Sequence, residues 1–274
     1  MRQCRSSRRE CCVASVGAMC EGSILRSRWG ITVAQRFSSA LYLLASSLLA
    51  SIVLSLGAAR AQTTPQQPPD TMAARVLACA SCHGAEGEGT SDVYFPRLAG
   101  KPAGYLYNQL VAFRDGRRKY PPMNYLLDFL PDPYLKQMAE HFASLRPPFP
   151  APAIPSVSND ILARGESIAV NGDPQRGVPA CASCHGASFG GMEPAIPGLL
   201  GLRASYISAQ LGGWRYGTRT AAAPDCMQIV AGLLTEDDVK AVAAYLSSRP
   251  APTDPSFARR GSLPMPLACG SQPN

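Results

Sequence analysis

The sequence has little histidine, few aromatic side chains and no segment that alternates polar and apolar residues as a β-strand does. Three histidines occur among 274 residues, which excludes a site built from several imidazoles in each part of the chain. The missing alternation argues against a sheet, and apolar residues recur instead at helical spacing. The sequence therefore predicts an all-α fold.

The chain also lacks the positive charge that binding to nucleic acid would require. The formal net charge is +7, but eight arginines and only two glutamates lie in residues 1–61. From Gln62 onward, 18 lysines and arginines stand against 17 acidic residues. The chain beyond its first segment is thus almost neutral, and a nucleic-acid partner is excluded.

Residues 1–61 are predicted to be an export signal. Arginines precede the apolar run 40–59, and the Ala-x-Ala sequence at 59–61 predicts cleavage before Gln62. The run is almost long enough to span a membrane, so an uncleaved anchor, with membrane association, is the alternative. The arginine-rich start is unlike a signal sequence, and translation from Met19 or later is a further hypothesis.

The sequence Cys-Ala-Ser-Cys-His-Gly-Ala occurs twice, at residues 79–85 and 181–187. Cys-x-x-Cys-His is the attachment motif of a c-type haem. Cysteines three residues apart point the same way from a helical turn, so both can form thioethers with the haem vinyl groups. The histidine that follows can ligate the iron. The predicted attachment residues and proximal ligands are Cys79, Cys82 and His83, and Cys181, Cys184 and His185.

A single Cys-x-x-Cys would also fit half of a zinc site or a thiol–disulfide pair. Two copies, each with histidine directly after the second cysteine, favour haem over both alternatives. The low aromatic content, 7%, also fits a core built around large planar cofactors. We therefore expect two covalently bound haem c groups, each with its iron.

The rest of the chain is a tandem repeat. Residues 96–118 match residues 197–219 at ten positions, so one helical unit is built twice. Between the copies, residues 146–155 contain five prolines and predict a stiff, extended linker. The predicted domains are residues 62–151 and residues 152–274, the second ending in an irregular tail.

The repeat also selects the sixth ligand of each iron. His141, the one remaining histidine, has no histidine at its counterpart, so it is predicted to be a surface or semi-buried residue without a role at iron. Met123 follows His83 by 40 residues and Met227 follows His185 by 42, both in a predicted loop between the second and third helices. We expect these two methionines to be axial thioether ligands. Because both irons are then closed to substrate, electron transfer is favoured over catalysis.

Several other residues have two interpretations each. Cys226 and Cys269 predict a disulfide in an exported protein, or two free thiols. The carbonyl groups of Pro96 and Pro197 either start an extended loop or also accept the free N–H of each proximal imidazole. The repeated arginines form a solvated face, or neutralise haem propionates or meet an acidic partner. These arginines are Arg114 and Arg118, and Arg215 and Arg219.

Together these motifs resemble the tandem di-haem class I cytochromes c, and within them the cytochrome c-four (c4) type. Each CASCHG is followed by Pro-x-Leu-x-Gly, Tyr-x-x-x-Gln-Leu and a methionine, and the resemblance spans about residues 71–248. It implies two class I cytochrome c domains that pack face to face. The same eight residues are implied as haem attachments and ligands. A longer segment 125–133, Cys226 beside Met227, and the tail depart from the pattern.

The resemblance also implies a function and partners. The protein would be a periplasmic electron carrier that passes single electrons between respiratory proteins. A quinol-oxidising complex or a dehydrogenase would be the donor, and a terminal oxidase the acceptor. The alternatives are a cytochrome subunit of a membrane dehydrogenase or oxidase complex and, less favoured, a di-haem peroxidase, which needs an open iron and acid–base groups.

Overall fold

The computed structural model describes residues 69–90, 94–252, 254 and 256–272. The predicted export signal lies outside the described residues. The described residues fall within one compact unit, Gln67–Asn274. They form helices and isolated bridges but no strand, which agrees with the all-α prediction. None of their helices has the length and apolar character needed to cross a bilayer.

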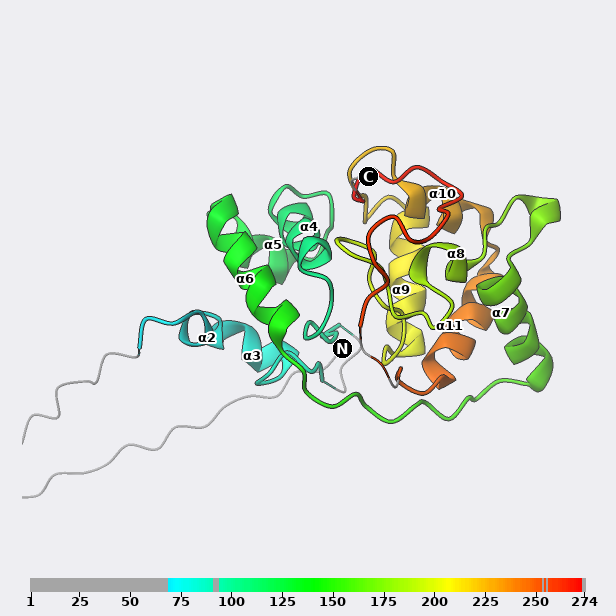
Figure 1. Ribbon diagram of the computed structural model, residues 1–274, viewed down its shortest axis with the longest axis horizontal. Helices are drawn as coiled ribbons and strands as arrows, with labels where there is room; N and C mark the ends of the chain where they lie inside the picture. Colours follow the sequence, from blue (N-terminus) through cyan, green and yellow to red (C-terminus); the bar gives the residue numbers. More distant parts are fainter. Residues whose placement is uncertain (1–68, 91–93, 253, 255, 273–274) are drawn as a thin grey trace, which may run out of the picture. The chain divides into compact units, whose positions relative to one another are not determined.

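The first repeat forms five helices around one core (Figure 1). Helix α4 packs against α5 and α6, and α2 packs against α6. The buried side chains Leu106, Phe113, Leu135, Met138 and Phe142 fill the space between them. The helices are α2 (Met72–Arg75), α3 (Leu77–His83), α4 (Ala103–Arg114), α5 (Pro121–Leu127) and α6 (Asp132–Ser144).

The second repeat has the same order with a longer first helix. Helix α11 packs against α7 and α9, and α10 packs against α9. Ile168, Leu211, Val242 and Leu246 are among its buried side chains. The elements are α7 (Asn159–Asn171), the 3₁₀ turn η1 (Pro174–Arg176), α8 (Cys181–His185), α9 (Ala204–Arg215), α10 (Cys226–Leu233) and α11 (Glu236–Ser248).

Two of these helices were expected to be loops. Met123 lies in α5 and Met227 in α10, where the sequence predicted a loop between the second and third helices. The prolines before Met123 suggested a break, but they occupy the first turn of α5, where a missing N–H costs nothing. In α10, Asp225 caps the start by accepting a hydrogen bond from the Gln228 amide at 3.1 Å.

The proline-rich linker is non-helical, as predicted, and it is fastened at both ends. The guanidinium of Arg97 donates hydrogen bonds to the carbonyl groups of Pro147 and Pro148 and stacks on the Phe149 ring at 4.2 Å. Further along, the amide of Ala153 donates to the Ser247 carbonyl at the end of α11 at 2.9 Å. The predicted division at residue 152 stays a prediction.

A buried carboxylate ties three elements of the second repeat together. Asp238 is fully buried and accepts hydrogen bonds from Arg164 of α7 and Arg176 of η1. It also completes a capping box with Thr235 at the start of α11. Burial alone would raise the pKa of Asp238, but the hydrogen bonds from Arg176, Thr235 and Arg164 outweigh it and hold that pKa well below its usual range.

We expect Asp238→Asn to destabilise the folded protein by roughly 2–4 kcal/mol, because Arg164 loses its charged partner and Arg176 keeps only Asp173. A carboxylate whose pKa is depressed on folding contributes stability above its unfolded pKa and loses it as the pH falls. The difference between the two proteins should therefore shrink below about pH 4. Denaturant unfolding at several pH values measures it, and a difference that stays constant down to acidic pH would contradict the assignment.

Candidate haem sites

Both Cys-x-x-Cys-His sequences form a short helical turn that ends in a buried histidine. Cys79 and Cys82 lie on α3, and Cys181 and Cys184 on α8; all four thiols are free and partly exposed. The glycines after the histidines adopt φ values of 85° and 80°, where a side chain would be strained. In each case the chain turns away directly after the imidazole.

Each imidazole is held by a proline carbonyl. The Nδ1 atom of His83 lies 2.9 Å from the Pro96 oxygen, and that of His185 lies 2.7 Å from the Pro197 oxygen. A carbonyl oxygen can only accept, so Nδ1 carries the hydrogen and Nε2 keeps its lone pair. Burial also lowers the pKa of both histidines, which favours the neutral form. The rings thus have the tautomer that metal ligation requires, and the predicted role of both carbonyl groups is confirmed.

In the second repeat, the predicted residues converge on one cavity. Cys181, Cys184, His185 and Met227 line the same largely apolar space between α8, α9 and α10. In the first repeat, Cys79 and Met123 pack against a common hydrophobic core, and His83 is buried at the end of α3. The assignment of the two methionines as iron ligands stays a prediction. His141 lies half-exposed on α6, as expected.

One buried donor in the second cavity has no partner. The indole Nε1 of Trp214 is buried without a hydrogen-bond acceptor, and the residue lines the cavity. An unpaired buried N–H costs about 1–3 kcal/mol, so it indicates an acceptor that protein atoms do not supply. A carboxylate of a haem in this space fits that requirement.

The two repeats meet through reciprocal arginine contacts. Arg118 and Arg219 face each other in an antiparallel bridge, flanked by hydrogen bonds from the Lys119 amide to the Thr218 carbonyl and from the Thr220 amide to the Arg117 carbonyl. The Arg118 guanidinium donates to the Tyr206 hydroxyl at 3.1 Å and to Gln210 at 2.7 Å. The Arg219 guanidinium donates to the Tyr105 hydroxyl at 3.3 Å and to Gln109 at 2.8 Å. The repeat thus builds a self-complementary contact.

These two arginines lack acidic partners. Arg219 is 4% exposed, and neither guanidinium forms an ion pair within the part of the chain that the structure describes. Burial of unpaired cations is costly, so this cluster also fits an anionic group. Arg114 and Arg215 differ, because they donate to the carbonyl groups of Leu130 and Leu234 and fasten the ends of α4 and α9. Arg114 also forms ion pairs with Asp115 and Asp132, so these two partly exposed arginines have a structural role at the helix ends.

The second cavity is not equivalent to the first repeat's surroundings. Lys101 lines it, together with Tyr105, Asn108 and Gln109, all from the first repeat. The counterpart of Lys101 in the second repeat is Leu202, and the counterpart of Trp214 is Phe113. Burial lowers the pKa of Lys101. Burial would raise the pKa of Tyr105, but the positive charges of Arg219, Arg118 and Lys101 outweigh it and lower that pKa to about 8. The second site therefore has one cation and one N–H donor that are not repeated.

The geometry gives no support to the zinc alternative. Within residues 69–272, apart from the gaps in the description, no three His, Cys, Asp or Glu side chains gather as a metal site would require. Burial raises the pKa of the free Cys181 thiol to about 11. A thioether sulfur is uncharged and tolerates this environment.

Comparison with known proteins identifies the class. The cytochrome c family profile matches residues 72–140 and 163–250. A curated relative, the thiosulfate dehydrogenase electron acceptor of Stutzerimonas stutzeri, is 37% identical over 63% of this chain and 79% of its own. Reduced cytochrome c4 from Pseudomonas stutzeri has a TM-score of 0.57 and 30% identity, covering 65% of this chain and 96% of that one.

A third comparison concerns a larger polypeptide. Thiosulfate dehydrogenase TsdBA from Marichromatium purpuratum has a TM-score of 0.57 and 36% identity over 63% of this chain. This chain spans only 36% of that polypeptide. The likeness therefore concerns the cytochrome part of the fold and leaves the activity of the whole protein aside.

The chain belongs to the cytochrome c family, as a di-haem electron carrier of the cytochrome c4 type. Its two cytochrome c regions each carry one covalently bound haem c.

We expect Lys101→Leu, which introduces the residue that the second repeat has at this position, to lower the reduction potential of the second haem on the order of tens of millivolts. Removing a nearby positive charge stabilises ferric iron relative to ferrous iron. Lys119→Leu is the matched control: Lys119 is exposed, so the same loss of charge is screened by solvent. Spectroelectrochemical titration measures both. If the reduction potential shifted equally in the two variants, or did not shift in Lys101→Leu, Lys101 would have no special effect on the second haem.

Proposed function

We propose that this protein is a periplasmic electron carrier that passes single electrons between redox proteins through two haems with His/Met ligation. In this proposal His83 and Met123 hold one iron, and His185 and Met227 hold the other. Haem iron supplies the one-electron chemistry. The observation that carries the proposal is the single cavity lined by both cysteines of α8, His185 and Met227.

The side chains around each site suit electron transfer better than catalysis. Each imidazole has its Nδ1–H engaged by a proline carbonyl, so neither is available as an acid or base. The apolar lining of the second cavity offers few groups to move a proton. A thioether opposite imidazole favours ferrous iron and a higher potential, as a carrier between a dehydrogenase and an oxidase needs.

The contact between the two repeats lies beside the second cavity. Arg118 and Arg219 bind across it, and the second cavity is lined by residues of both repeats. In the proposed function these cations balance the propionates of both haems and hold the domains in one fixed relation. An electron that enters one domain can then leave from the other.

The periplasmic location is supported by chemistry as well as by the leader. Cys226 and Cys269 are joined in a disulfide, which settles the open choice between a bridge and free thiols. Disulfides persist in oxidising compartments outside the cytoplasm. The predicted export signal, outside the described residues, is consistent with that location.

A second candidate is a cytochrome subunit of a dehydrogenase complex. It is supported by the similarity to TsdBA and to proteins described as electron acceptors of thiosulfate dehydrogenase. The chemistry at the haems would be the same in either case. Only the persistence of the association with the donor distinguishes a subunit from a diffusing carrier.

We expect Met123→Ala and Met227→Ala each to abolish about half of the weak far-red band that Met–iron bonding gives the ferric protein, because each removes one thioether. Met138→Ala is the control: Met138 is a buried methionine of the first core with no proposed role at iron. Visible spectra of the loaded proteins provide the measurement. An unchanged band in either ligand variant would remove that residue from the site.

The donor can be identified by rapid kinetics. We expect a thiosulfate dehydrogenase, supplied with thiosulfate, to reduce both haems at least tenfold faster than a quinol-oxidising complex does. Two relatives of this chain are named as electron acceptors of thiosulfate dehydrogenase. Stopped-flow absorption under equal concentrations compares the two donors. Faster reduction by the quinol-oxidising complex would transfer the donor role to it.

A further inference from the structure

We propose that the C-terminal segment 258–272, here called the strap, positions Met227 and closes the second haem site against external ligands. The inference rests on the proposed function, because it takes Met227 as an iron ligand. The strap has no equivalent in the first repeat. It would make the two centres unequal in how easily the methionine can be displaced.

The beginning of the strap is attached on the histidine side of the second site. The amide of Ala258 donates to the Gly191 carbonyl at 2.9 Å, and the Glu193 amide donates to the Ala258 carbonyl at 3.0 Å. Gly191 and Glu193 belong to the loop between His185 and Pro197, and the Pro197 carbonyl orients the imidazole. The strap therefore starts on the segment that fixes the proximal ligand.

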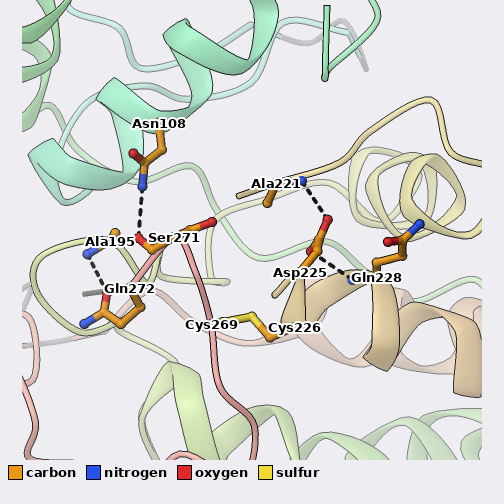
Figure 2. Close-up of a disulfide and its surroundings, with 9 residues drawn as sticks. All are labelled: Asn108, Ala195, Ala221, Asp225, Cys226, Gln228, Cys269, Ser271 and Gln272. Atoms are coloured by element: carbon orange, nitrogen blue, oxygen red, sulfur yellow. Dashed lines mark hydrogen bonds between the residues drawn. A yellow bond between two sulfur atoms is a disulfide. The ribbon is translucent and has the colours of Figure 1, made fainter. Parts of the chain in front are cut away.

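Its end is attached covalently on the methionine side. Cys269 forms a disulfide with Cys226, the residue directly before Met227 in the first turn of α10 (Figure 2). The Gly270 amide also donates to the Pro224 carbonyl at 2.9 Å. A Cβ atom at Gly270 would collide with the carbonyl of Ala223, so only glycine allows this close backbone approach.

Beyond the disulfide, a buried glutamine locks the strap in place. Gln272 is 5% exposed; its Oε1 accepts from the Ala195 amide at 2.9 Å and its Nε2 donates to the Glu193 carbonyl at 2.7 Å. Both partners lie on the histidine-side loop. The strap thus returns to its starting loop after contacting α10, as the sticks in Figure 2 show for its last residues.

The strap also lies over the cavity and contacts the first repeat. Leu267, Cys269 and Ser271 line the second cavity beside Met227. The side chain of Asn108 on α4 donates to the Ser271 carbonyl at 3.0 Å (Figure 2). An external ligand that entered here would have to displace these residues as well as the thioether.

The first repeat holds its methionine without a covalent link, through packing and through hydrogen bonds of the next residue, Asn124, to the carbonyl groups of Phe113 and Arg118. Pro122 precedes Met123 where Cys226 precedes Met227, so no disulfide can form there. Of the residues that follow, Leu127 is buried, but Tyr125 is 82% exposed and Phe129, after the end of α5, is 88% exposed. Movement of Met123 away from iron therefore breaks no covalent link, whereas movement of Met227 is opposed by the disulfide.

The test measures displacement of methionine by imidazole in the ferric holoprotein. Met123→Ala is the background, so that the remaining far-red band reports the second haem. Into it we introduce Cys226→Ser with Cys269→Ser. We expect imidazole to bind the second haem roughly tenfold or more tightly once the disulfide is lost, because Cys226 then no longer ties the start of α10 to the strap. Ser262→Ala, at an exposed strap residue that bonds only within the strap, is the control and should change nothing.

A second experiment does not depend on whether the serine variant folds and incorporates haem. The Met123→Ala holoprotein, already loaded, is treated with dithiothreitol. The disulfide takes two electrons and two protons and becomes two thiols, while the dithiol becomes a cyclic disulfide. The thiols are alkylated, and the haems are reoxidised with ferricyanide before titration. Gln272→Ala, with the disulfide intact, is expected to give a smaller increase in affinity.

The results separate the strap from the function on which it rests. If imidazole affinity at the second haem is unchanged both in the serine variant and after reduction, the strap proposal is overturned while Met227 remains the ligand. If Met227→Ala keeps its full far-red band, the ligand assignment itself fails. Increased affinity in both arms, with an unchanged control, supports the strap.

Discussion

A hydrogen bond from each buried histidine to a proline carbonyl is the interaction on which both sites depend. It places the hydrogen on Nδ1 and leaves Nε2 as the only nitrogen that can meet a metal. The loop that brings the proline back is closed in the same way in both halves: the amides of Gly89 and Gly191 donate to the histidine carbonyl groups at 2.7 and 2.9 Å. Both glycines have positive φ values, and a Cβ on either would strike the backbone beside the proline.

The duplication produces a symmetric contact with asymmetric surroundings. Arg118 and Arg219 exchange the same kinds of contact with Tyr and Gln residues of the opposite repeat. Lys101, Trp214 and the C-terminal strap, however, all act on the second site only. Two haems of the same chemistry can have different reduction potentials when the charges around them and their enclosure by the protein differ. Such a difference gives direction to electron flow within one chain.

The sequence predicted the parts of the fold that depend on local pattern. The repeated helical unit, the helical spacing of apolar residues and the turn of Cys-x-x-Cys-His can each be recognised in a short stretch of sequence, and each is present in the structure. Helices α5 and α10 were not predicted, because the prolines at the start of α5 and the cap residue before α10 are residue types that are also common in loops. The pairing of Cys226 with Cys269 stayed open, since sequence shows that two cysteines exist but not that their Cα atoms lie 5.0 Å apart.

The contacts between the two repeats could not be predicted from local sequence patterns. Lys101 belongs to one repeat and lines the cavity of the other, and nothing in its neighbours along the chain indicates this. The separation of Arg114 and Arg215, which hold helix ends, from Arg118 and Arg219, which face each other, likewise needs tertiary structure. The ligand set itself follows from the repeat, and its assignment to iron stays a proposal.

The central claim is that imidazole and thioether close both irons, so that the protein relays electrons and offers no site for a substrate. Addition of carbon monoxide to the reduced, intact holoprotein tests this most directly, because the gas binds only where a coordination position is open or readily vacated. We expect the visible spectrum to stay unchanged. Stoichiometric formation of a carbonyl complex at either haem would contradict it.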